Sequence, residues 1–134
     1  MNLILVDTNV LIDISKGDSD WYDWSTAALD RAISRGIVCT NEVVFAELSF
    51  GYDDARQIEM LLDKLGILLQ RTPNDALYLA GRAYQKYRQR RGSKSGVLPD
   101  FFIGAHAAVE GAQLLTRDAR RVTTYFPTVE VISP

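Results

Sequence analysis

The sequence is poor in metal-binding and redox-active side chains, with one cysteine, Cys39, and one histidine, His106, among 134 residues. A single cysteine cannot form a disulfide within the chain, and this is typical of proteins from a reducing compartment. Structural zinc sites generally take four cysteine or histidine ligands, and the His-Glu-x-x-His motif needs two histidines. These absences exclude a disulfide framework, a zinc finger and a zinc protease of that type.

Long apolar runs are also missing. No stretch approaches the ~20 residues that a membrane-spanning helix needs, and Asp7 and Asp13 interrupt the apolar start of the chain, unlike the core of a signal peptide. Internal repeats and proline- or serine-rich linkers are absent as well. We therefore expect residues 1–134 to form a single domain in the cytoplasm, without a membrane partner.

The glycine-rich phosphate loops and the serine nucleophile elbow are absent too. Neither the dinucleotide fingerprint nor the P-loop occurs, and residues 92–96 have Lys94 where an elbow would have serine. Two interpretations of Cys39 and His106 stay open: a catalytic dyad, or a buried strand cysteine and an ordinary helix histidine.

Charge is nearly balanced in total but not along the chain. The net charge is -2, which does not indicate a basic nucleic-acid binder. Residues 1–70 carry twelve acids and five bases, whereas residues 71–134 carry five acids and ten bases. This division predicts a site where acidic and basic surfaces meet.

Short apolar runs alternate with amphipathic helical patterns, which predicts an α/β fold with a mainly parallel sheet of four to five strands. Helices are expected between the runs, and proline at position 99 suits the start of one of them. The strands are expected at residues 2–6, 37–40, 67–69, 112–116 and, as an edge strand, 128–132.

Four acids are expected at one edge of this sheet. Asp7 directly follows the first strand, and Asp118 comes two residues after the fourth. Asp100 opens a helix, and Glu47 lies about two turns into the helix that leaves the second strand. In open parallel sheets, ligands bind outside the carboxyl ends of the strands. Each acid also has a simpler interpretation, as a helix cap, a dipole partner or half of an ion pair.

A metal ion explains all four acids together. Glu47 lies on a helix that is apolar nearly all round, where an uncompensated carboxylate is costly. Clustered carboxylates repel one another and generally need a cation to stay ionised. Oxygen ligands without cysteine or histidine favour Mg²⁺ or Mn²⁺, and such ions support hydrolysis of phosphodiester bonds.

These residues resemble the PIN-domain family, and in particular the VapC-type toxins of toxin–antitoxin pairs. The resemblance covers nearly the whole chain and rests on residues 6–13 (VDTNVLID), Glu47, residues 99–105 (PDFFIGA) and residues 115–118 (LTRD). Gly104 departs mildly from the alanine that is usual in the family. The resemblance implies a three-layer α/β/α fold, a single nuclease domain and a metal-dependent endoribonuclease.

The resemblance also implies site residues and partners. Asp7 and Asp100 would be direct metal ligands, and Glu47 and Asp118 would complete the quartet, directly or through water. Hydrogen-bonding support would come from Thr8, Asn9 and Thr116. The expected partners are RNA, a second copy of the chain and a cognate VapB-like antitoxin that blocks the acidic groove.

Basic residues are candidates for RNA binding. Arg117, beside Asp118, is the first choice, followed by Arg90 and Arg91 in a cluster interleaved with Tyr84 and Tyr87. The same cluster is equally well interpreted as a solvated helix face with core tyrosines.

Two other functions stay open from the sequence. One is a non-catalytic RNA-binding or scaffold domain. The other is an aspartate-dependent phosphatase, although that chemistry usually needs a second aspartate two residues after the first, where this chain has Asn9.

Overall fold

The apolar runs form one parallel sheet in a computed structural model that describes residues 2–17, 20–91 and 97–134. Residues 92–96, which have Lys94 in place of the elbow serine, lie outside this description. Within them the strand order is β3-β2-β1-β4-β5, and all four pairings are parallel. The strands are β1 (Asn2–Val6), β2 (Gly36–Thr40), β3 (Leu68–Leu69), β4 (Gln113–Leu115) and β5 (Val131–Ile132).

Helices connect the strands and begin or end where the sequence provides a cap. Asn41 precedes α3, and its side-chain oxygen accepts hydrogen bonds from two backbone amides of the first turn. Gly66 and Gly111 end α4 and α6 in the left-handed conformation that glycine adopts without strain. The helices are α1 (Thr8–Lys16), α2 (Tyr22–Arg35), α3 (Glu42–Leu48), α4 (Ala55–Leu65), α5 (Asn74–Arg91), α6 (Leu98–Glu110) and α7 (Arg120–Tyr125), with a 3-10 turn at Ser49–Gly51.

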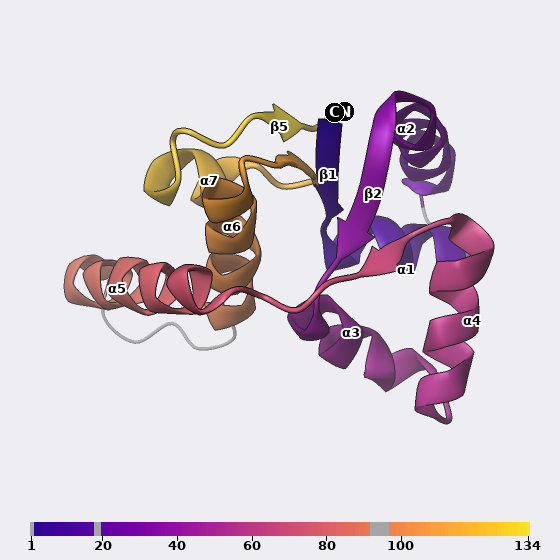
Figure 1. Cartoon of the computed structure of the whole chain (residues 1–134), viewed down its shortest axis with the longest axis horizontal. Helices are drawn as coiled ribbons and strands as arrows, with labels where there is room; N and C mark the ends of the chain where they lie inside the picture. Colours follow the sequence, from indigo (N-terminus) through magenta and orange to yellow (C-terminus); the bar gives the residue numbers. More distant parts are fainter. Residues whose placement is uncertain (1, 18–19, 92–96) are drawn as a thin grey trace.

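The helices lie in two layers, as Figure 1 shows, with α1, α2 and α4 on one side of the strands and α5, α6 and α7 on the other. The chain runs from β1 through β2 to β3 in one direction, then returns past β1 to β4 and β5. Since such crossovers are right-handed, reversing the direction moves the helices to the opposite face. The prediction of an α/β/α fold with a mainly parallel sheet is confirmed.

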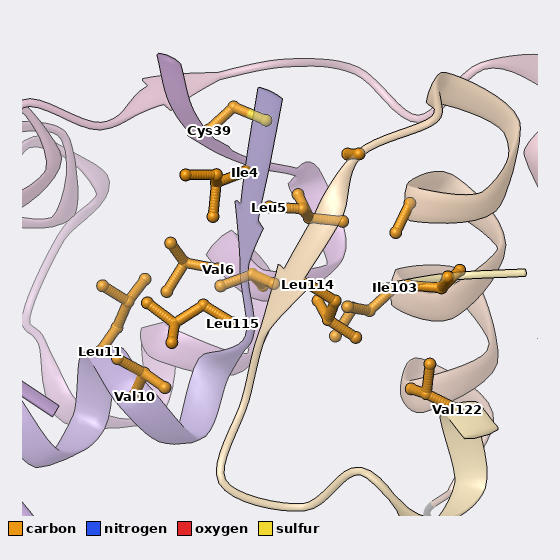
Figure 2. Close-up of a cluster of buried hydrophobic side chains, with 14 of the residues drawn as sticks. Ile4, Leu5, Val6, Val10, Leu11, Cys39, Ile103, Leu114, Leu115 and Val122 are labelled. Carbon is orange, nitrogen blue, oxygen red and sulfur yellow. The ribbon is translucent and has the colours of Figure 1, made fainter. Parts of the chain in front are cut away.

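The core lies between the sheet and each helix layer. Successive residues of β4 alternate, so that Leu114 faces Ile103 of α6 while Leu115 lies with Val10 of α1 (Figure 2). All four side chains are at most 1% exposed. The observed strands are shorter than predicted at several ends, and β5 in particular begins at Val131.

None of the helices in the described parts of the chain combines the length and the hydropathy needed to cross a membrane.

Candidate active site

A cavity of about 120 Å³ lies where the order of the strands reverses, between the carboxyl ends of β1 and β4. Open α/β sheets bind ligands at this switch point, because the connections to the two neighbouring strands leave it in opposite directions. Ile103, Leu114 and Val122 form the apolar part of the lining (Figure 2). The polar lining consists of Asp7, Asn9, Asp100, Asp118 and Arg121.

Asp7 is held by neutral hydrogen-bond donors. The backbone N–H of Thr8 donates to Oδ1 at 2.7 Å, and the hydroxyl of Thr116 donates to Oδ2 at 2.7 Å. Nδ2 of Asn9 donates to Oγ1 of Thr116 at 3.2 Å and lies 3.5 Å from Asp7 Oδ2. These contacts join β1, α1 and the end of β4, so the carboxylate of Asp7 has one fixed orientation.

Thr116 also orients the turn that carries Asp118. Its hydroxyl oxygen accepts a hydrogen bond from the backbone N–H of Asp118 at 3.1 Å. The side-chain oxygen of Asn9 accepts one from the backbone N–H of Arg117 at 3.2 Å. One buried hydroxyl and one amide therefore connect Asp7 with Asp118, 111 positions further along the chain.

Glu47 is brought to the edge of this network by Thr8. The Thr8 hydroxyl donates to Glu47 Oε1 at 2.6 Å, across the contact between α1 and α3. Glu47 is half-buried and does not line the cavity itself. Its negative charge is nevertheless close enough to raise the pKa of Asp7.

Asp100 and Asp118 each have an arginine partner from the start of α7. Arg121 Nη1 donates to Asp100 Oδ2 at 2.6 Å. Arg120 donates to both oxygens of Asp118, at 3.0 Å from Nε and 2.8 Å from Nη2. The two pairs differ in exposure, since the side chain of Arg120 is 90% exposed and that of Arg121 only 31%.

The carboxyl groups therefore differ in proton affinity. Burial raises the pKa of Asp7 to about 6; the hydrogen bond from Thr116 opposes this rise, and the charges of Asp100 and Glu47 add to it. Burial also raises the pKa of Asp100, although Arg121 opposes the change. Hydrogen bonds from Arg120 lower the pKa of Asp118 to about 2. The inner part of the site is thus short of positive charge.

The donor set fits a hard cation held partly by water. Asp7 and Asp100 offer carboxylate oxygens to one cavity, and Asp118 lines it from the other side of the switch point. No group of three or more acidic, histidine or cysteine side chains in the described residues is arranged to hold an ion. Mg²⁺ is commonly bound by one or two carboxylates with several waters, so an all-protein cage is not required.

Arg117 and Arg90, two of the arginines selected from the sequence, are not part of the cavity lining. Arg117 donates to both oxygens of Asp13, at 2.7 and 3.2 Å, and its guanidinium lies 5.4 Å from the ring centre of Trp21. Arg90 is exposed on α5, and Arg91 belongs to the same helix.

Tyr84 and Tyr87 belong to the core. Tyr87 is 4% exposed, Tyr84 is half-buried, and both pack against Phe101 with ring centres 5.4 Å away. They are therefore packing residues rather than stacking platforms for bases.

Arg121 is the site residue that the sequence reasoning missed. The available signal was the density of arginines beside an acid, in residues 117–121 (RDARR). That pattern does not say which acid each arginine meets, because Asp100 is 21 positions away and Asp13 is 104 positions from Arg117.

Cys39 and His106 are packing residues and do not form a nucleophilic pair. Burial raises the pKa of the Cys39 thiol to about 11, so it stays protonated at neutral pH. Asn41 uses its oxygen to cap α3, so its amide nitrogen faces Nδ1 of His106 at 3.0 Å and that ring nitrogen must accept. Burial lowers the pKa of His106, in keeping with a neutral ring.

The fold is shared with solved toxin–antitoxin proteins. The chain is similar to the structure of VapBC2 from Rickettsia felis bound to a DNA fragment from their promoter, with a TM-score of 0.71 and 18% identity over 98% of both chains. It is similar to VapBC-5 from Mycobacterium tuberculosis, with a TM-score of 0.63 and 20% identity over 100% of both chains. It also resembles VapC20 of Mycobacterium tuberculosis, a Sarcin-Ricin loop cleaving toxin, with a TM-score of 0.60 and 16% identity over 95% of this chain and 98% of the other.

Among curated proteins, none matches the sequence. The PIN domain family model matches residues 4–126, from the second half of β1 to the end of α7. Because this match spans nearly all of the sheet and the entire candidate site, the chain belongs to the PIN domain family.

Proposed function

We propose that this chain is a metal-dependent endoribonuclease, acting as a single nuclease domain over residues 1–134, and that it is the toxin of a toxin–antitoxin pair. The observation that carries the proposal is that Asp7 and Asp100 line one cavity at the switch point without enough positive charge around Asp7. Membership of the PIN domain family supports it, as does the likeness to VapC20 and to VapBC complexes.

The residues of the site have separate tasks in this proposal. Asp7 and Asp100 would hold Mg²⁺, or Mn²⁺ in its place, and the cation would supply the charge that activates water and stabilises the phosphodiester transition state. Thr116 and Asn9 keep the Asp7 carboxylate in one orientation. Glu47, fixed by Thr8, and Asp118 would complete the acidic site, by direct contact with the cation or through water.

The basic substrate residues of the proposal lie further out. Arg90 and Arg91, at the end of α5, would contact RNA phosphates away from the cut. Arg117 would contribute charge while it remains paired with Asp13.

The proposed partners are an RNA substrate, a second copy of this chain and a VapB-like antitoxin, in the cytoplasm. The structural neighbours support the antitoxin, since several are toxin–antitoxin complexes. Expression of the chain alone is expected to arrest growth, and a small protein encoded beside it is expected to relieve the arrest and copurify. Light scattering of the free chain tests the dimer.

The nuclease proposal is tested by RNA cleavage with Mg²⁺, with EDTA and in the Asp7→Asn and Asp100→Asn variants. Asp63→Asn, which removes an exposed acid on α4, is the charge-matched control. We expect cleavage with Mg²⁺ by the wild type and the control, and loss of cleavage in the other three cases. Metal-independent cleavage, or full activity of either site variant, contradicts the proposal.

A non-catalytic RNA-binding domain is the second candidate, because Arg120 and Arg121 already neutralise two of the four acids. It predicts RNA binding without turnover, and indifference to Asp7→Asn. The phosphatase alternative loses support, because the residue two positions after Asp7 is an amide that donates to Thr116. Trapping a phosphoaspartate at Asp7 would restore it.

A further inference from the structure

Arg121 lines the cavity, where its positive charge would interact with both a bound cation and an RNA phosphate. Its guanidinium donates to Asp100 Oδ2 at 2.6 Å, and its side chain lines the cavity together with Asp7. Its central carbon lies 5.5 Å from the ring centre of Tyr87, which is buried. The aromatic ring supports the guanidinium on one side, and the carboxylate holds it at the other.

The ion pair between Arg121 and Asp100 competes with binding of a metal ion by the Asp100 carboxylate. One of its two oxygens already accepts from Arg121, and a cation bound between Asp7 and Asp100 would repel the nearby guanidinium. A phosphate group brought to the same cation carries the opposite charge. Arginine binds phosphate and carboxylate with the same planar set of donors, so one can replace the other.

We propose that Arg121 is a phosphate-binding residue of the site, which Asp100 holds in place until metal and RNA bind. Metal binding frees the guanidinium from Asp100, and the RNA phosphate beside the metal then becomes its partner. Tyr87 keeps the side chain at the cavity through the exchange. This inference rests on the proposed nuclease function and adds a substrate-binding residue to it.

The proposal requires opposite effects on two affinities when the charge is removed. In Arg121→Gln, Mn²⁺ binding measured by electron paramagnetic resonance without RNA should become tighter, by about three- to fivefold, because a competing ion pair is lost. Binding of a fluorescein-labelled random-sequence single-stranded RNA in Ca²⁺, measured by polarisation, should weaken. The slope of log affinity against log salt concentration should fall by about 0.7, the value for one phosphate contact.

Arg56→Gln removes one positive charge from α4, on the other side of the sheet, and is the matched control. It should leave Mn²⁺ binding unchanged. Weaker or unchanged Mn²⁺ binding in Arg121→Gln overturns the proposal, since the ion pair would then only position Asp100, and so does unchanged RNA binding. If Arg121→Gln does not fold, Arg121→Lys carries the test: it keeps the charge but not the planar donors, so RNA binding must weaken while Mn²⁺ binding stays near that of the wild type.

Failure of the underlying function gives a different result. If the wild type binds no Mn²⁺ or cuts no RNA, the nuclease proposal is wrong. If it does both and only the Arg121→Gln predictions fail, the nuclease proposal stands and the assignment of Arg121 is wrong.

Discussion

Asp7 and Asp13 are six residues apart, before and within α1, and their surroundings differ sharply. Asp13 is 2% exposed, and it accepts hydrogen bonds from Arg117 at 2.7 and 3.2 Å and from Ser25 at 2.7 Å. Asp7 is half-buried and accepts from a backbone amide, a hydroxyl and a side-chain amide. Among the described residues no arginine or lysine forms an ion pair with it.

The difference separates a structural acid from a reactive one. A buried carboxylate with a permanent basic partner stabilises the fold, and it has little capacity left for a ligand. A carboxylate oriented by neutral donors keeps an unbalanced charge, which an incoming cation can neutralise. Burial raises the pKa of Asp7, and the neighbouring charges of Asp100 and Glu47 raise it further.

The largest expected effect is on activity, in Asp7→Asn. Loss of a direct metal ligand should lower kcat/KM for RNA cleavage by more than about 100-fold, the upper end of the effect of supporting residues. The Tm at pH 7 should change little, because the loss of an unbalanced charge offsets the one hydrogen-bond acceptor that the amide nitrogen no longer provides. Steady-state kinetics and thermal unfolding test both parts. A Tm loss as large as that of an Asp13 variant would make Asp7 a structural acid as well.

Asp13→Asn should show the reverse pattern. It leaves Arg117, whose side chain is 29% exposed, without its charged partner, and we expect a loss of about 2–3 kcal/mol in the free energy of unfolding. Urea unfolding measures this, with Asp63→Asn as the exposed control. Stability equal to that of the control would contradict the structural role.

The pH dependence of stability should also distinguish the two acids. In EDTA, the folded protein binds a proton at Asp7 with a pKa of about 6, above its ordinary value of 3.8. This raised pKa adds stability below pH 4, and that contribution is lost as the pH rises through 6. The stability of Asp7→Asn relative to the wild type should therefore increase by about 2 kcal/mol from pH 4 to 7.

Thermal unfolding of both proteins across this range tests the sign. A constant difference between them would mean that Asp7 ionises normally. Added Mg²⁺ should reduce the difference at pH 7, since it stabilises only the protein that binds it.

The smallest effect is expected for Arg120→Gln. Its pair with Asp118 is exposed, and exposed ion pairs contribute little to stability. We expect an unchanged Tm, in contrast to Asp13→Asn. A large drop in Tm would show that the exposed pair of Arg120 and Asp118 contributes as much to stability as the buried pair of Arg117 and Asp13.

Much of the fold could be predicted because its signals are local. The apolar run before Asp7 predicted a strand, and Pro99 marked the start of a helix that the structure shows. The convergence of Asp7 and Asp118 followed from the geometry of parallel strands, whose carboxyl ends share one edge. The ends of β5 were less predictable, because short edge strands depend on pairing.

Gly104 shows what local patterns leave open. The PIN-domain resemblance leads one to expect alanine at this position, but a Cβ there would lie 2.5 Å from Cδ2 of Phe126. The ring of Phe126 packs close to Phe101 in the aromatic cluster between α6 and the end of α7. Glycine is required by a neighbour 22 positions away, and nothing near it in the sequence indicates this.

The sequence by itself determined the order of strands and helices and the positions of Asp7, Asp118 and Asp100 at strand ends or a helix start, because backbone propensity and hydrophobic periodicity act over a few residues. Only the tertiary structure decided which base each acid meets: Arg117 for Asp13, Arg120 for Asp118, Arg121 for Asp100, and none for Asp7 among the described residues. Two of these three pairs join segments that are distant in the chain. Their formation depends on how α1, α6 and α7 pack around the sheet, and that packing left Asp7 with a charge that no basic side chain in the described parts of the chain balances.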